Sequence, residues 1–388
     1  MVKQALEALL SFRPLTLLGV GPMSATCVDA TIELAKEHDV PIMLVASRRQ
    51  VECGELGRGY VEGWTTQSFA DYVRERDASG NIVLCRDHGG PWQGNGETEP
   101  PLDAATAMER AKISYAADID AGFSVLHVDP SIDPLFKVPP QETVLERLFE
   151  LYRFCWRYAQ AQGRRVVFEI GTEEQVSLAG GLGDTERALV EVERVLRKEG
   201  LPMPLFVVVQ TGTKVEETRN VGVFGSPLRV ENELPAELHV PLAITLLRRH
   251  GVYLKQHNTD YLDDENLSWL PRLGVSAANV APEFGVVETR TWLELMRQGG
   301  REDLAERFVA LSLASGKWKK WLSANTATTD LDRAVISGHY VFSTSEFREI
   351  ATETEATLAA HAIDARAVVR ERVKAAIRRY LVNFRLVR

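Results

Sequence analysis

The sequence predicts an α/β fold, a TIM or (β/α)8 barrel, followed by a C-terminal helical extension. Short apolar segments of β type recur eight times between residues 15 and 280, and segments with helical spacing separate most of them. Strict alternation of strand and helix implies parallel strands joined by helical crossovers. Beyond residue 300 only helical patterns follow.

The strands are expected at residues 15–20, 41–46, 82–85, 125–128, 166–170, 206–209, 252–255 and 275–280. The barrel helices are expected at residues 24–38, 104–120, 141–162, 184–199, 241–250 and 286–297. An open doubly wound sheet alternates in the same way, but it calls for a glycine-rich phosphate fingerprint after the first strand. The turn Gly19-Val-Gly21-Pro22 is too short for that fingerprint and is interrupted by proline. The closed barrel is therefore favoured.

Two regions follow from this pattern. Residues 1–300 form the barrel, with the active site at the C-terminal ends of its strands, and residues 301–388 form a helical extension packed on it. Helices are expected in the extension at residues 302–313, 316–322, 345–361 and 365–386. Its many basic residues suit solvated faces of amphipathic helices, although a phosphate or an acidic partner subunit would also suit them.

Composition excludes several classes of protein. The 388 residues are 45% hydrophobic and 26% charged, which is enough to bury a large core, and the net charge of −9 argues against a nucleic-acid partner. The four cysteines are scattered without metal-type spacing, which indicates reduced thiols and a cytoplasmic protein. Neither an export signal nor an apolar run of membrane-spanning length is visible, so we expect no membrane partner.

Titratable or polar residues lie at the ends of successive predicted strands: Asp87 with His88, Asp129, Glu169, Gln210 and His257. TIM barrels build active sites from such positions, because separate strand ends let ligands converge on one point. The set predicts a divalent metal site with His88, Glu169, Gln210 and His257 as candidate ligands. Zn²⁺ is favoured over Mn²⁺ or Mg²⁺ because imidazole suits it. His127 lies deeper on its strand than Asp129, so we expect it to be a buried, hydrogen-bonded residue rather than a ligand.

Carboxylates near this set are candidates for proton transfer. A divalent ion polarises a carbonyl, and Asp87 beside it could move a proton to or from a hydroxyl, as aldol cleavage demands. Glu173 follows Glu169 in a glycine-containing loop and could supply a second acid. Asp87 could instead only cap the following turn.

The order of these motifs resembles the Z-type subunit of tagatose-1,6-bisphosphate aldolase, which is related to the class II metal-dependent ketose-bisphosphate aldolases. The resemblance runs from about residue 15 to residue 290 and is carried by Asp87-His88-Gly-Gly-Pro91, His127-Val-Asp129-Pro-Ser131, Glu169-Ile-Gly171-Thr172-Glu173, Gln210-Thr-Gly212 and His257-Asn-Thr-Asp260-Tyr261. It implies a TIM barrel in which His88 and His257 match metal-holding positions. It also implies that Asp87 exchanges protons with a substrate hydroxyl, with Asp129 and Glu169 beside the metal.

The chain departs from the class II aldolases at three positions. Gln210 stands where they offer a further histidine, as in Z-type chains, which alters the ligand set. Their phosphate loops after the seventh and eighth strands are replaced by His257-Asn-Thr-Asp260 and by Asn279-Val-Ala-Pro282-Glu283. Asp260 and Glu283 would repel a phosphate. We therefore expect a sugar or sugar phosphate to meet a different set of strand-end residues: Arg86, Ser131, Asn258, Asp260, Asn279 and Glu283.

Three functions remain open on sequence grounds. The first is a metal-dependent carbohydrate enzyme of the class II aldolase type, acting on a ketose or sugar derivative by retro-aldol and aldol chemistry as an epimerase or aldolase. The second is a non-catalytic subunit that stabilises a tagatose-bisphosphate aldolase complex. The third is an isomerase of a sugar acid, with Arg86 or Lys255 pairing the substrate carboxylate. In each case the helical tail offers a surface for a homo-oligomer or for an aldolase partner subunit.

Overall fold

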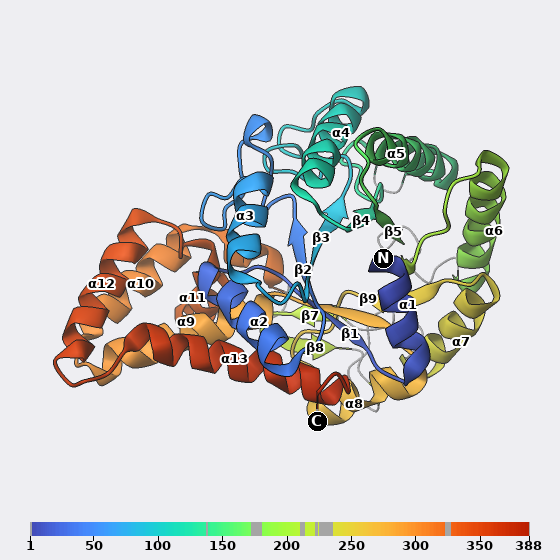
Figure 1. Ribbon diagram of the computed structural model, residues 1–388. Helices are drawn as coiled ribbons and strands as arrows, with labels where there is room; N and C mark the ends of the chain where they lie inside the picture. The colour runs from blue at the N-terminus through green and yellow to red at the C-terminus, as the bar shows by residue number, and fades with distance from the viewer. Residues whose placement is uncertain are drawn as a thin grey trace.

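The chain folds into a closed parallel barrel surrounded by helices (Figure 1). The computed structural model describes residues 2–136, 139–171, 181–209, 214–221, 224, 236–322 and 327–387. Within them, the barrel strands are hydrogen-bonded in the order β1-β10-β9-β6-β5-β4-β3-β2. Their bounds are β1 Leu17–Val20, β2 Ile42–Ser47, β3 Ile82–Gly89, β4 Val125–Val128, β5 Val167–Gly171, β6 Phe206–Val208, β9 Tyr253–Gln256 and β10 Ala277–Val280. The predicted TIM barrel is therefore confirmed, and each expected segment contributes one strand.

The helices between these strands form the outer layer of the barrel (Figure 1). Their bounds are α2 Ala25–His38, α3 Thr66–Arg76, α4 Ala104–Ala121, α5 Gln141–Ala161, α6 Gly181–Glu199, α7 Ala236–Arg249, α8 Asp264–Leu273 and α9 Pro282–Gln298. Local capping sets several of their starts. The side chains of Ser24, Thr65 and Asp103 accept main-chain N–H groups three residues ahead, which satisfies donors that a helix leaves open.

Some elements were not expected from the sequence. Helix α1 (Val2–Phe12) precedes the barrel, and α3 buries a narrow face made mainly of Phe69, Ala70 and Val73 in an otherwise polar segment. Helix α8 carries Pro271 in its last turn, where proline disguises a helical pattern. After β6, strands β7 (Lys214–Glu216) and β8 (Arg219–Val221) pair as an antiparallel hairpin outside the barrel.

The C-terminal extension contributes to two different cores. Helices α10 (Glu302–Ala314), α11 (Asp330–Ser337) and α12 (Ser345–Ala359) pack with α9, and the 3-10 turns η2 (Lys317–Trp321) and η3 (Gly338–Tyr340) join them. Helix α13 (Ala365–Asn383) returns to the barrel and lies beside α2 and α8 (Figure 1). Its Val373, Ile377 and Leu381 are buried in the same core as the barrel strands. The division at residue 300 remains a prediction, and the packing groups α13 with the barrel.

None of the helices in the described part of the chain is long and apolar enough to cross a membrane. The four cysteines are all buried and free of disulfide bonds.

Candidate active site

A break in strand β3 brings Asp87 and His88 to the same side. Alternation along a strand would point two neighbouring side chains to opposite faces. The pairing of β3 with β4 shifts register between Arg86 and Gly89, and His88 adopts a left-handed backbone with φ of 43°. Such a bulge re-aims a side chain. It places the imidazole of His88 with the residues that line the inside of the barrel, and β3 extends to Gly89, four residues beyond the predicted strand end at residue 85.

The chain leaves this bulge through a position that only glycine can fill. Gly90 has φ of +157°, and a Cβ atom there would lie 2.0 Å from the carbonyl oxygen of Asp129. The buried side chain of Arg48 donates to the Gly90 carbonyl oxygen at 2.7 Å and to Glu97 at 2.7 Å. These contacts fix the start of the segment after β3 against the end of β4.

Asp129 holds one nitrogen of His88. Its Oδ2 lies 2.7 Å from Nδ1 of His88 and 3.0 Å from Nε2 of Gln93, and its Oδ1 accepts the main-chain N–H of Ser131 at 3.0 Å. Burial raises the pKa of Asp129, but the hydrogen bond from His88 outweighs burial and leaves the pKa well below its usual value. An ionised carboxylate only accepts, so in a neutral His88 the proton lies on Nδ1 and the lone pair lies on Nε2.

Glu169 holds one nitrogen of His257, as Asp129 holds one nitrogen of His88. Oε1 of Glu169 lies 2.9 Å from Nε2 of His257, and Oε2 lies 2.6 Å from Nζ of Lys255. Burial raises the pKa of Glu169, but the charge of Lys255 and the neighbouring imidazoles bring it well below its usual value. The proton of a neutral His257 therefore lies on Nε2, and the lone pair lies on Nδ1.

The two imidazole lone pairs face each other. Nδ1 of His257 lies 3.2 Å from Nε2 of His88. Two facing lone pairs repel unless a cation, either a proton or a metal ion, lies between them. Two nitrogens bound to one Zn²⁺ at about 2.1 Å each would be separated by about 3.4 Å at a tetrahedral angle, so the observed distance is close to that of a shared ion. An N–H···N hydrogen bond would give a similar distance, and metal uptake separates the two cases.

His127 and Asp87 complete the cluster. The ring centroid of His127 lies 5.2 Å from that of His88 and 5.1 Å from that of His257. Nδ1 of His127 accepts the main-chain N–H of His88 at 3.2 Å, and burial lowers its pKa, which keeps the ring neutral. Oδ1 of Asp87 lies 3.7 Å from Nδ1 of His257 and accepts from the Asn279 amide at 3.1 Å. These groups lie close enough together to hold one metal ion.

The sequence comparison identifies the family. Residues 12–296 match the model of the family described as D-tagatose-1,6-bisphosphate aldolase subunit GatZ/KbaZ-like. The chain belongs to this family. The resemblance expected from the motifs is thereby confirmed over most of the barrel.

Known relatives of this GatZ/KbaZ-like chain agree with that assignment. D-tagatose-1,6-bisphosphate aldolase subunit GatZ of Klebsiella oxytoca is 30% identical over 220 residues, which is 50% of this chain and 49% of the relative. The match therefore spans about half the length of that relative.

Solved structures show the same fold at lower identity. A probable tagatose 6 phosphate kinase from Sinorhizobium meliloti 1021 has a TM-score of 0.76 at 19% identity, covering 95% of this chain and 100% of that one. The fructuronate-tagaturonate epimerase UxaE from Cohnella laeviribosi has a TM-score of 0.57 at 12% identity, covering 96% and 82%. Fructose-bisphosphate aldolase from Campylobacter jejuni has a TM-score of 0.56 at 11% identity, covering 100% and 94%.

Several predicted site residues of this GatZ/KbaZ-like chain take other positions or roles. The guanidinium of Arg86 is buried against Asp118, at 2.6 and 2.8 Å, and donates to the carbonyl oxygens of Ala46 and Val51. Because Arg86 is turned away from the histidine cluster and fully engaged, we no longer regard it as a substrate ligand. Lys255 is likewise engaged by Glu169, so the sugar-acid isomerase loses both of its expected cations.

The geometry also revises the predicted ligand set. Both oxygens of Glu169 are engaged, one by His257 and one by Lys255, which favours a positioning role over metal ligation. Asp129 acts in the same way on His88 rather than directly in catalysis. Gln210 and Glu173, the remaining predicted ligand and acid, lie outside the described residues.

The other predicted substrate-binding residues divide into two groups. Asn279 contacts Asp87 and so lies in the cluster, and buried Ser131 adjoins it through Asp129. Asn258 follows His257 directly, and its carbonyl oxygen accepts from the Asn220 amide at 3.0 Å. Asp260 accepts two main-chain N–H groups at the start of α9, and Glu283 accepts the main-chain N–H of Tyr261. These contacts favour a structural role for both side chains, and their contact with substrate stays a prediction.

Sequence reasoning missed Gln93 and gave Lys255 a different role, as a partner of a substrate carboxylate instead of Glu169. Gln93 belongs to an irregular segment whose path depends on Arg48, so no local pattern marks it. Lys255 stands two residues before His257 on β9 and therefore shares its face, which was a usable signal.

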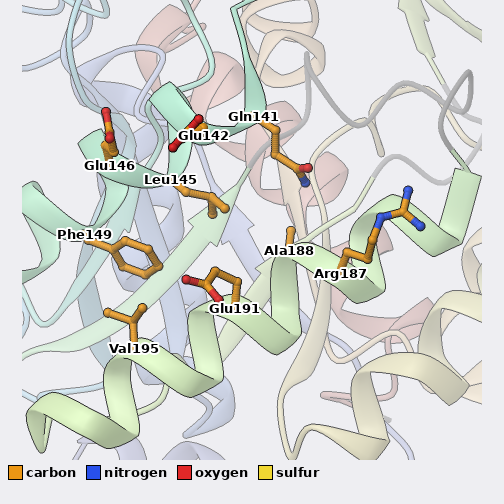
Figure 2. Close-up of a pocket in the computed structure, with 9 residues that line it drawn as sticks. All are labelled: Gln141, Glu142, Leu145, Glu146, Phe149, Arg187, Ala188, Glu191 and Val195. Carbon is orange, nitrogen blue, oxygen red and sulfur yellow. The ribbon is translucent and has the colours of Figure 1, made fainter.

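A groove on the outside of the barrel does not belong to this site. It lies between α5 and α6 (Figure 2), and its lining includes Leu145, Phe149 and Val195 with acidic side chains at its rim. None of its lining residues is in the histidine cluster.

Proposed function

We propose that this chain is a metal-dependent carbohydrate enzyme of the class II aldolase type, acting on a ketose or sugar derivative by retro-aldol and aldol chemistry as an epimerase or aldolase. The observation that carries the proposal is the 3.2 Å contact between Nε2 of His88 and Nδ1 of His257. A carboxylate lies behind each ring, and such carboxylate–histidine pairs orient imidazoles toward metal ions in proteins.

His88 and His257 would hold the ion, and Gln210 is the remaining predicted ligand. Imidazole ligands favour Zn²⁺, and Mn²⁺ or Mg²⁺ are alternatives. When bound, a divalent ion in this position polarises a carbonyl group and stabilises negative charge on its oxygen. Asp129, Glu169 and Lys255 are positioning residues, because they fix the orientation of the imidazole rings of His88 and His257.

Asp87 is the proposed acid–base residue. Burial raises its pKa, but interactions with the neighbouring imidazoles and with the charge of Lys255 outweigh burial, so the pKa of Asp87 lies below its usual value. Asp87 is therefore a carboxylate at neutral pH and can accept the proton of a substrate hydroxyl. As that O–H bond breaks, the oxygen forms a C=O bond and the adjacent C–C bond breaks, leaving its electron pair on the carbonyl-bearing fragment. Re-addition to the other face of the new carbonyl, with return of the proton from Asp87, gives the epimer.

Metal content provides the first test. The purified protein should contain about one divalent ion per chain by elemental analysis, and His88→Ala and His257→Ala should each lose it. His250→Ala is the matched control, because His250 also pairs with a carboxylate, Glu193 at 2.8 Å, but on the outer helices. Retention of metal in both cluster variants would refute the metal site.

Turnover provides the second test. Ketoses and their phosphates should be screened for epimerisation and cleavage with the metal-loaded protein, and Asp87→Asn should lose about 100-fold or more in kcat, the usual contribution of a positioned acid or base. A metal-loaded wild-type protein without turnover, or an Asp87→Asn variant with wild-type kcat, would contradict the enzymatic role.

Membership of a family described as aldolase subunits favours a second candidate function, the stabilisation of a separate catalytic aldolase subunit. A stabilising subunit should raise the activity and thermal stability of a catalytic tagatose-bisphosphate aldolase subunit on mixing, and Asp87→Asn should do so equally well. The predicted homo-oligomer is tested in the same samples by light-scattering mass.

A further inference from the structure

The segment that joins β9 and β10 to the start of α9 lies where TIM barrels commonly bind phosphate. These are the seventh and eighth barrel strands in chain order. The loops after such strands, together with a helix N-terminus, form the usual phosphate site, because helix N–H groups and the helix dipole attract anions. Helix α9 begins at Pro282, immediately after β10 ends at Val280.

In this chain a side chain already occupies those donors. Oδ1 of Asp260 accepts the main-chain N–H of Ala281 at 3.0 Å and that of Glu283 at 2.9 Å. Pro282, between them, has no N–H to offer. The side chain of Asp260 is buried, with 2% of its surface exposed. The carboxyl group of Asp260 therefore takes the position that a bound anion would take.

A second carboxylate reinforces this arrangement. Oε2 of Glu283 accepts the main-chain N–H of Tyr261 and the hydroxyl of Tyr380, and Oε1 lies 3.6 Å from the guanidinium of Arg379. The amide of Asn220 donates to the carbonyl oxygen of Asp260 at 2.9 Å. The segment from Asp260 to Glu283 is thus held by α13 and by the β7–β8 hairpin, and it cannot open without breaking those contacts.

The electrostatics disfavour any additional anion here. Burial, together with the charge of Glu283, raises the pKa of Asp260 to about 8. At neutral pH Asp260 is therefore mostly protonated, and it excludes an anion by occupying the two N–H donors. The negative charge of Glu283 beside it would repel a phosphate dianion.

We propose that Asp260 is a specificity-determining residue: it fills the anion position at the start of α9, so the end of the substrate that approaches the loops after β9 and β10 carries no phosphate. The inference rests on the proposed carbohydrate function, and it narrows the substrate class to ketoses that are unphosphorylated at that end. Asp260 follows His257 by three residues, so the blocked anion position lies near the metal-binding pair. The unphosphorylated end is therefore the end of the ketose that lies near His257.

Inorganic phosphate is the direct probe, titrated by calorimetry into metal-free protein so that the metal mechanism plays no part. Asp260→Ala exposes the N–H groups of Ala281 and Glu283 and should bind phosphate about tenfold or more tightly than wild type, since 1.4 kcal/mol corresponds to tenfold. Asp260→Asn, which keeps an acceptor in place, should bind it as weakly as wild type. Equal phosphate affinity in folded wild type and Asp260→Ala would overturn the role of Asp260.

A second measurement needs no variant and covers the case in which Asp260→Ala does not fold. Metal-loaded wild type should be stabilised against heat more by D-tagatose than by D-tagatose 1,6-bisphosphate at equal concentration. Stronger stabilisation by the bisphosphate would overturn the inference while leaving the metal site and Asp87 intact. Loss of the metal site, by contrast, would appear in metal content and not in the phosphate titration.

Discussion

Nζ of Lys255 lies 2.6 Å from Oε2 of Glu169, and both side chains are buried inside the barrel. The other carboxylate oxygen, Oε1, lies 2.9 Å from Nε2 of His257. The ammonium group therefore fixes the carboxylate, and the carboxylate fixes the imidazole whose Nδ1 faces His88. Because breaking one partner of a buried ion pair leaves an uncompensated charge, this series of contacts keeps His257 in one orientation.

The corresponding contact, between Asp129 and His88, can be weakened with less disturbance of the fold. Asp129→Asn keeps the shape of the side chain but removes the charge that orients His88, so we expect metal affinity to fall about 10- to 100-fold while the fold is kept. Competition with a chelator measures the affinity. Glu193→Gln, at the carboxylate paired with His250 outside the site, should leave it unchanged. If Asp129→Asn binds metal like wild type, Asp129 does not position His88.

Glu288 should make stability depend on pH. It is buried on α9, accepts from the Ser24 hydroxyl at 2.5 Å, and burial raises its pKa to about 7. Between the pKa of Glu288 in the unfolded chain and about pH 7, Glu288 keeps a proton in the folded state that it has lost in the unfolded state. The contribution of Glu288 to the free energy of unfolding therefore falls as the pH rises through this range. The loss is at most of the order of 3 kcal/mol.

Glu288→Gln removes that titration. Relative to wild type, the variant should therefore gain unfolding free energy on going from pH 5 to pH 8, as measured by urea unfolding at both values. Glu294→Gln, at an exposed carboxylate on the same helix, is the matched substitution and should show no such gain. A wild-type pH response in Glu288→Gln would mean that Glu288 is ionised throughout the range.

Helix α13 should unfold together with the barrel, because it contributes side chains to the barrel core. Ile377 on α13 is fully buried in the barrel core, whereas Val382 on the same helix is 45% exposed. Ile377→Ala should lower the free energy of unfolding by about 2–5 kcal/mol, and Val382→Ala should change it by about 0.5 kcal/mol or less. Denaturant unfolding should show one transition for barrel and α13 together. Loss of α13 in a separate early transition would instead support the boundary at residue 300.

Much of the fold could be read from local pattern. Each barrel strand is a short apolar run, and each is followed by a turn or polar strand end, so the number and order of the strands were predictable from residues close in sequence. The same local signal marked Asp87, His88 and His257 as strand-end residues. It could not mark α13 as a barrel element, because that helix packs against β1, more than 300 residues away in the chain.

The sequence by itself determined the barrel, the helical extension and the identities of the polar groups at the strand ends, because strand and helix periodicity are local properties. Only the tertiary structure decided what those groups do. The bulge at His88 turns its side chain to the opposite side from the one that strand alternation predicts. Glu169 contacts both Lys255 and His257, and Asp260 accepts a main-chain N–H at the start of α9. Each of these outcomes depends on which distant atoms meet in the closed barrel, and hydrogen bonds and charges act through space rather than along the chain.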